Sequence, residues 1–228
     1  MTRVVVLAGG VPHAHDFAAT GAALADLYRA AGDTVAVVDH PDAVVAALAG
    51  ADVLVVSALY WTMAGDAYDA WRAEWAYTTP PATRRAIAEF VGGGGGLVAN
   101  HTASICFDDW PEWGDIVGGA WQWGVSSHPP AGPVHARVAV EHPVVAGVGE
   151  QFELVDEVYG DLAVRPGIEV LATAQRTPDD ADQPVVWAHR YGAGRVVYDG
   201  FGHDAASITD ANNARVLTQA LEWATGGN

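Results

Sequence analysis

The chain has 228 residues, of which 28 are acidic and 11 are basic, and its formal charge at pH 7 is −17. Every basic residue is an arginine, which excludes a Schiff-base enzyme and a lysine-containing phosphate-binding loop. The scarcity of cations argues against a nucleic-acid partner, and the single cysteine, Cys106, allows neither an internal disulfide nor a cysteine-based zinc site.

Half of the residues are hydrophobic, enough to bury a large core in one domain, which we expect to span residues 1–228. No apolar run reaches the ~18 residues that a membrane span needs, so no membrane partner is expected. The first residues enter a strand-like run directly, without the features of a signal peptide. We therefore expect a cytoplasmic protein, and the sequence leaves its oligomeric state open, a homo-oligomer included.

The first half of the chain alternates short apolar runs with segments of helical periodicity. Valine-rich runs of four to six residues predict strands, and apolar residues three and four apart predict helices. The predicted strands are 4–8, 34–39, 53–57 and 96–100, and the predicted helices are 17–31, 41–48 and 83–91. Strands that are apolar on both faces indicate a parallel sheet covered by helices on both sides.

The second half of the chain is richer in strands that follow one another closely. A short turn at residues 191–194 predicts a hairpin. Strands are predicted at 134–140, 152–155, 169–173, 185–189 and 195–199, and a last helix at 212–224. The predicted fold class is therefore α/β, with a mainly parallel sheet and additional antiparallel strands in the second half.

Histidines recur where the predicted strands end. His13 and His15 follow the first strand, His101 follows the fourth, and His203 follows the last. In an open parallel sheet, ligands bind outside the carboxyl ends of the strands. We favour one shared site at this edge over the alternative that each histidine caps its own strand or helix.

His13 and His15 are two residues apart in a loop, a spacing that lets both face one metal ion or one sugar. Asp16 could orient an imidazole, bind directly, or cap the helix that begins at Phe17. The sequence has no established metal-binding spacing such as HExxH. A bound divalent metal ion therefore stays an open alternative.

A second group of candidate residues is Asp156, Glu157 and Tyr159. Adjacent side chains of a strand point to opposite faces, so one carboxylate is expected to enter the pocket as an acid or base and the other to be structural. The alternative is an ordinary acidic turn in an acidic protein.

Tyr60 and Trp61 directly follow the third predicted strand, and we expect them beside a ligand. Indole faces stack on sugar rings, although filling the core is the alternative role for a tryptophan. Cys106 lies several residues beyond His101, which occupies the strand end where a nucleophile elbow would stand. We therefore expect Cys106 to be a buried or loop thiol.

Short motifs follow one another in order along nearly the whole chain. They are Gly9-Gly10 with His15-Asp16-Phe17, residues 90–101, 116–119 with His128-Pro129, 142–144, 156–159, 184–187, and 192–198 leading into Gly202-His203. As an ordered set they resemble the trehalose-utilisation (ThuA-like) family. The tryptophan-rich segment 71–77 departs from the family pattern.

The resemblance implies a flavodoxin-like, class I glutamine amidotransferase-like three-layer sandwich. It also implies that glutaminase activity is lost, because residues 99–103 lack the nucleophilic cysteine of an amidotransferase elbow. The late H-x-E pair of an amidotransferase is missing too, since His203 is followed by Asp204 and Ala205. The resemblance further implies a role in carbohydrate utilisation, which in this family is linked to keto-sugar intermediates.

From these observations we expect an enzyme that acts on a sugar or keto-sugar by hydrolysis, isomerisation or elimination, with a small-molecule carbohydrate as its partner. A divalent metal ion, if bound, would polarise the keto group. The alternatives are a non-catalytic sugar-binding or regulatory module and a Cys106-dependent hydrolase. The expected catalytic residues are His101, His128, Asp156, Glu157 and His203, and the expected substrate-binding residues are His13, His15, Asp16, Tyr60, Trp61 and Tyr159.

Overall fold

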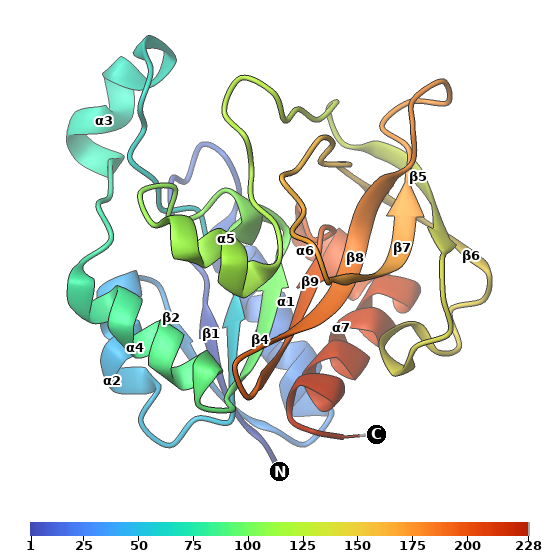
Figure 1. Cartoon of the computed structure of the whole chain (residues 1–228), viewed down its shortest axis with the longest axis horizontal. Helices are drawn as coiled ribbons and strands as arrows, with labels where there is room; N and C mark the ends of the chain where they lie inside the picture. The colour runs from blue at the N-terminus through green and yellow to red at the C-terminus, as the bar shows by residue number, and fades with distance from the viewer. Residues whose placement is uncertain (228) are drawn as a thin grey trace.

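The computed structural model describes residues 1–227 and contains a nine-stranded sheet with the order β2-β1-β3-β4-β9-β8-β7-β5-β6 (Figure 1). Strands β2, β1, β3, β4 and β9 run parallel, and the pairs from β9 to β6 are antiparallel. The strands are β1 (Arg3–Leu7), β2 (Thr34–Val38), β3 (Val53–Val56), β4 (Gly96–Asn100), β5 (Gly132–Val138), β6 (Gln151–Asp156), β7 (Glu169–Ala174), β8 (Gln183–Tyr191) and β9 (Gly194–Asp199).

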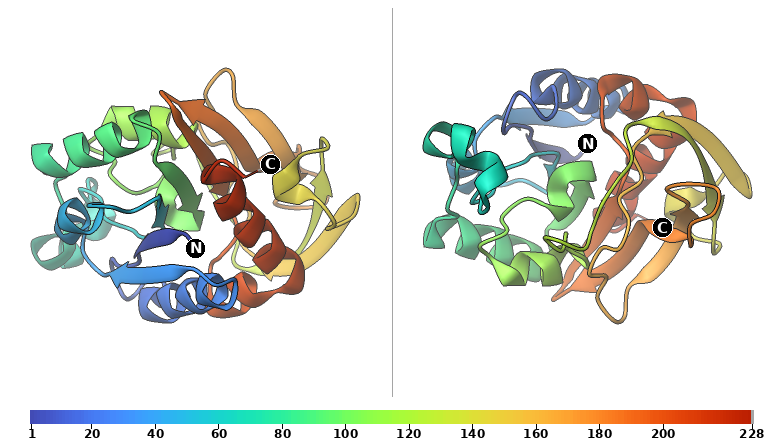
Figure 2. Two further views of the ribbon diagram at one scale, coloured as in Figure 1. Left: turned by 90° about the horizontal axis from the view of Figure 1, so that it is seen from below. Right: turned by 90° about the horizontal axis from the view of Figure 1, so that it is seen from above.

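Helices cover both faces of the sheet and give three layers, as the end views in Figure 2 show. One face packs against α1 (Phe17–Ala30), α6 (Ala205–Thr209) and α7 (Ala211–Ala224). The other face packs against α2 (Pro41–Ala47), α4 (Pro81–Gly92) and α5 (Pro111–Val117). Helix α3 (Asp69–Trp75) projects from the body of the molecule, and three 3₁₀ turns lie at Asp66–Tyr68, His101–Ser104 and Pro143–Val145.

The two cores follow from strand geometry, because successive side chains of a strand point to opposite faces. In β3, Val53 and Val55 enter the core under α1 and α7, whereas Leu54 and Val56 enter the core under α2 and α4. All four side chains are fully buried. An apolar run without alternation is therefore what a strand covered on both faces requires.

Local sequence signals define several boundaries. The Asp16 carboxylate accepts a hydrogen bond from the Ala19 backbone N–H at 3.0 Å and caps the first turn of α1. Gly32, with φ of 96°, follows the end of the same helix. The β8–β9 hairpin turns at Gly192, whose φ of 59° suits glycine, and Tyr191 pairs with Gly194 across the turn.

The predicted fold class is confirmed, and each predicted strand and helix has a counterpart shifted by a few residues at most. Helices α3, α5 and α6 were not predicted, because each has seven residues or fewer and carries little periodicity. Helix α3 buries none of its side chains. That residues 1–228 form a single domain stays a prediction.

Between residues 1 and 227, no helix combines the length and the apolar character needed to cross a lipid bilayer.

The two-sided burial of the central strands predicts where valine side chains matter. Val98 of β4 is fully buried, whereas Val155 of β6 is 64 % exposed. We expect Val98→Ala to lower the free energy of unfolding by about 2 kcal/mol, through lost burial and a new cavity. The same change at Val155 is expected to cost less than about 1 kcal/mol. Urea denaturation of both variants measures the difference, and equal losses would contradict the two-sided core.

Candidate functional site

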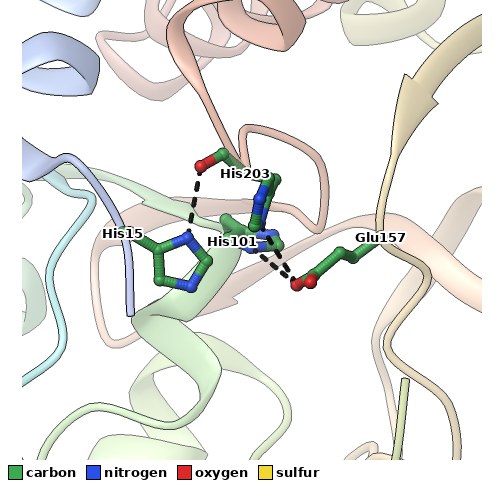
Figure 3. A group of neighbouring side chains, drawn as sticks. All are labelled: His15, His101, Glu157 and His203. Atoms are coloured by element: carbon green, nitrogen blue, oxygen red, sulfur yellow. Dashed lines mark hydrogen bonds and ion pairs between the residues drawn. The ribbon is translucent and has the colours of Figure 1, made fainter. Parts of the chain in front are cut away.

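A cluster of three histidines and one glutamate lies at the carboxyl edge of the parallel strands. His15 follows β1, His101 follows β4, His203 follows β9, and Glu157 follows β6. One nitrogen or oxygen atom from each of the four side chains lies within 4.8 Å of the others. Figure 3 shows the four side chains converging from separate segments of the chain. The strand ends thus gather His15, His101 and His203, as predicted, while His13 remains outside this cluster.

His101 is held in a strained turn directly after β4. Its φ of 47° lies in the left-handed region, which is uncommon for a side chain other than glycine. The imidazole is buried, and its Nδ1 lies 2.8 Å from the carbonyl oxygen of Gly200. Its Nε2 lies 3.1 Å from the Tyr159 hydroxyl, and the Tyr198 hydroxyl donates to the His101 carbonyl at 3.0 Å. The turn therefore projects the imidazole from the strand end in one fixed orientation.

His15 packs edge-on against both other histidines of the cluster. Its ring centroid is 5.0 Å from that of His101 and 4.8 Å from that of His203. Its Nδ1 lies 3.2 Å from the His203 carbonyl oxygen. Burial, helped by the proximity of His101, lowers the pKa of His15 to about 4. His15 is therefore a neutral imidazole at pH 7.

Glu157 is the shared partner of the histidines. One carboxylate oxygen lies 3.5 Å from Nε2 of His101 and 3.4 Å from Nδ1 of His203, and the other lies 3.2 Å from Nδ1 of His128. Burial by itself raises the pKa of Glu157, but electrostatic attraction to the three surrounding imidazoles outweighs it and holds this pKa well below its ordinary value. The Glu157 carboxylate in turn raises the pKa of His128 and that of His203.

Asp156 points away from the histidines and organises the loop that carries His203. Its carboxylate accepts hydrogen bonds from the Gly202 backbone N–H at 2.7 Å, from the His203 backbone N–H at 3.4 Å, and from the Ser207 hydroxyl. The two neighbouring carboxylates therefore take different roles, as strand alternation predicts. Of the expected catalytic residues, Asp156 acts here as a positioning residue.

Aromatic rings extend from the cluster toward the surface. Tyr159 packs on His101 with ring centroids 4.5 Å apart and on His128 at 5.1 Å. Trp121 lies 5.3 Å from Tyr159 and 6.0 Å from His128. Trp121 was not among the residues predicted for the site, because no residue near it in the sequence indicates a contact with Tyr159. The two residues are 38 positions apart in the chain, and only the folded structure brings their rings together.

A pocket of about 570 Å³ opens beside His15. It contains three of the expected substrate-binding residues, His15, Asp16 and Tyr60. Its remaining side walls include Asp39 and Trp75, which the sequence did not single out. A volume of this size suits a small-molecule ligand.

The other three residues expected to bind substrate lie outside this pocket: Tyr159, which packs on His101, and Trp61 and His13. Trp61 is only 5 % exposed and packs with Val11, Phe17 and Leu59, so its indole face is occupied by protein. His13 is exposed at the loop tip, where its ring centroid lies 6.4 Å from that of Trp71 on α3.

In a comparison with known protein families, residues 3–224 match the ThuA family, which is described as trehalose utilisation. The flavodoxin-like sandwich is thus the class of fold, and the chain belongs to the ThuA family. A ThuA-like protein from Parabacteroides merdae ATCC 43184 has a TM-score of 0.81 at 20 % identity, covering 99 % of this chain and 91 % of that one. A ThuA-like protein from Bacteroides uniformis ATCC 8492 has a TM-score of 0.70 at 19 % identity, with coverages of 100 % and 94 %.

The fold also occurs inside a larger enzyme. The β-galactosidase from Rahnella sp. R3 aligns with 97 % of this chain over 31 % of its own length, with a TM-score of 0.65 and 16 % identity. At such identities the solved structures show a shared fold alone. Comparison with curated proteins finds no match. The family membership relates the protein to carbohydrate utilisation.

The contacts of Asp156 predict its importance for the loop that carries His203. We expect Asp156→Asn to lower the free energy of unfolding by about 1–3 kcal/mol, because a buried amide cannot accept all the hydrogen bonds that the carboxylate accepts. Thermal and urea denaturation measure the loss. Unchanged stability would show that the loop is held by other contacts.

Cys106 is buried, and its sulfur accepts a hydrogen bond from the Tyr60 backbone N–H at 3.4 Å. Burial raises the pKa of the thiol far above its ordinary range, so almost no thiolate forms at neutral pH. We expect iodoacetamide to leave the folded protein unmodified and to alkylate Cys106 after denaturation, as judged by mass spectrometry. Rapid alkylation of the folded protein would contradict this expectation and support the alternative of a Cys106-dependent hydrolase.

Proposed function

We propose that this ThuA protein is an enzyme that moves a proton at the carbon beside the carbonyl group of a keto-sugar. The observation that carries the proposal is the pair formed by half-exposed His128 and buried Glu157, at the rim of the histidine cluster. The family description, trehalose utilisation, supports a sugar as the substrate, and the keto form is part of the proposal. The pair supports the reaction, because an imidazole held by a carboxylate is a common proton-transfer device in enzymes.

The orientation of His128 favours its use as a base. Its Nδ1 faces two acceptors, a Glu157 carboxylate oxygen at 3.2 Å and the Pro129 carbonyl oxygen at 3.1 Å. In the neutral imidazole the proton therefore resides on Nδ1, and Nε2 carries the free lone pair. Glu157 both orients the ring and stabilises the imidazolium that forms when Nε2 takes up a proton.

The chemistry needs no oxidant or reductant. Nε2 of His128 removes the proton from the carbon next to the keto group, and the electron pair of the broken C–H bond moves onto the carbonyl oxygen. If the deprotonated carbon carries a hydroxyl group, the hydroxyl proton shifts to the former carbonyl oxygen. Return of the first proton from Nε2 to the former carbonyl carbon then gives an isomer whose carbonyl group has moved by one carbon. If the next carbon, two bonds from the carbonyl carbon, carries an oxygen substituent, the enolate re-forms the carbonyl group and expels that substituent, which takes the proton from Nε2 of His128. A carbon–carbon double bond forms in this elimination, and both routes share the first step.

Substrate contacts are available on both sides of this pair. Tyr159 and Trp121 offer aromatic rings next to His128 for the apolar face of a sugar. On the far side of the cluster, the pocket beside His15 offers the Asp16 and Asp39 carboxyl groups, which accept hydrogen bonds from hydroxyl groups. We assign sugar recognition to these groups.

The proposal predicts exchange of a carbon-bound hydrogen with solvent. In deuterium oxide, the wild-type protein is expected to place deuterium beside the carbonyl group of a 3-keto-disaccharide, as followed by nuclear magnetic resonance. His128→Ala should lower the exchange rate by about 10²–10⁴-fold. His135→Ala is a matched control, because His135 is also paired with a glutamate, at 3.0 Å, but on the exposed surface of β5.

Two results would contradict the proposal. Wild-type rates in His128→Ala would remove His128 from the reaction. Tight binding of sugars in calorimetry, without exchange or turnover by the wild-type protein, would identify the non-catalytic sugar-binding module instead.

A further inference from the structure

The buried cluster contains polar atoms that the protein itself does not satisfy. Oε2 of Glu157 and Nδ1 of His203 are both buried without a hydrogen-bond partner, although they lie only 3.4 Å apart. A buried polar atom left unpaired costs about 1–3 kcal/mol. Both atoms lie among the imidazoles of the cluster. Two unpaired polar atoms at one buried place indicate that a bound ligand or ion completes the site.

Backbone carbonyls fix the protonation pattern of two imidazoles in the cluster. The Gly200 carbonyl lies 2.8 Å from Nδ1 of His101, and the His203 carbonyl lies 3.2 Å from Nδ1 of His15. Each carbonyl can only accept, so in the neutral rings each Nδ1 carries the proton and each Nε2 offers a lone pair. In His101 that lone pair also faces the Tyr159 hydroxyl at 3.1 Å. Histidines that bind metals are oriented in this way, with the non-ligating nitrogen donating to a carbonyl or carboxylate.

We propose that His15, His101, His203 and Glu157 bind one divalent first-row transition metal ion, of the zinc, cobalt, manganese or iron type. The donors are three imidazole nitrogens and one carboxylate oxygen, all within 4.8 Å of one another. This donor set suits these ions, whereas magnesium and calcium prefer sites built from oxygen alone.

The size of the cluster agrees with this assignment. A tetrahedral ion with bonds of about 2 Å holds its ligand atoms about 3.3 Å apart. Contacts of 3.4 Å and 3.5 Å already join Glu157 to His203 and His101. These two separations are thus already close to the spacing that a bound ion requires, and all four donor atoms lie within 4.8 Å of one another.

A metal site at this cluster would extend the proposed function, and it can be tested independently of that function. His128 contacts the second oxygen of Glu157 and lies outside the proposed ligand set. A metal ion at the cluster would supply a Lewis acid for the keto oxygen, beside the base that removes the proton. Metal binding is measurable by itself, whatever the substrate proves to be.

The experiment uses the full chain without a histidine tag. After dialysis against a chelator, the protein is titrated with Co²⁺ and its visible absorption and metal content are recorded. We expect about one ion per chain and d–d absorption bands typical of nitrogen ligation. A wild-type protein that binds no Co²⁺ and no Zn²⁺ would overturn the assignment without any variant.

Variants then locate the ion. His203→Ala and the isosteric Glu157→Gln should each weaken Co²⁺ binding by about 10-fold or more. The exposed His135→Ala should bind as the wild type does, since His135 lies on β5 with its side chain 70 % exposed. Circular dichroism checks folding of each variant. Equal binding by the wild type and by folded Glu157→Gln and His203→Ala would place the ion elsewhere and refute the proposal.

His128→Ala separates the two proposals. It should keep the bound Co²⁺ and its absorption bands while losing deuterium exchange. If the wild type binds the ion at the cluster but never exchanges hydrogen, the metal site stands and the proposed function fails. If exchange proceeds in protein that binds no ion, the proposed function stands and the metal site fails.

Discussion

The register between β4 and β9 is the constraint on which the site depends. These two parallel strands pair Asn100 with Asp199, so that His101 and Gly200 emerge side by side at the same edge. The hydrogen bond between the His101 ring and the Gly200 carbonyl follows directly from this pairing. Sliding either strand by one residue would reverse its side chains and remove His101 from the cluster.

The packing of the next residues preserves that register. Gly202 adopts a φ of 118°, and a Cβ atom there would lie 2.7 Å from the side-chain oxygen of Asn100. The Asn100 amide donates to the Phe201 carbonyl at 2.6 Å. The chain between β9 and His203 therefore packs closely against the end of β4. These backbone contacts place the imidazole of His203 in the cluster.

The antiparallel half of the sheet takes part in the site through the end of β6. Asp156 hydrogen-bonds the loop after β9, and Glu157, the next residue, faces the imidazoles. Two consecutive carboxylates thus connect an edge strand of the sheet to the ends of its central strands. A negative charge is retained at Glu157 despite burial because three imidazoles surround it.

Much of this arrangement could be predicted from the sequence, and the limits are instructive. Strand ends located His15, His101 and His203, because parallel strands share one carboxyl edge. Alternation separated the roles of Asp156 and Glu157. The sequence could not show that Trp61 turns into a small core while Trp121 reaches Tyr159, since both follow from how loops pack. Nor could it show which nitrogen of each histidine faces inward, because backbone carbonyls distant in sequence decide that.

The strained turn at His101 has a consequence for how this fold acquires different chemistries. A left-handed residue after a central strand costs about 1–3 kcal/mol, and that cost belongs to the backbone rather than to the side chain displayed. At this strand end the sequence departs from the cysteine elbow of the amidotransferases that it resembles, and the side chain displayed here is an imidazole. The turn thus fixes where a side chain is displayed at the edge of the sheet, while the identity of that side chain and of its neighbours decides which chemistry the position can support.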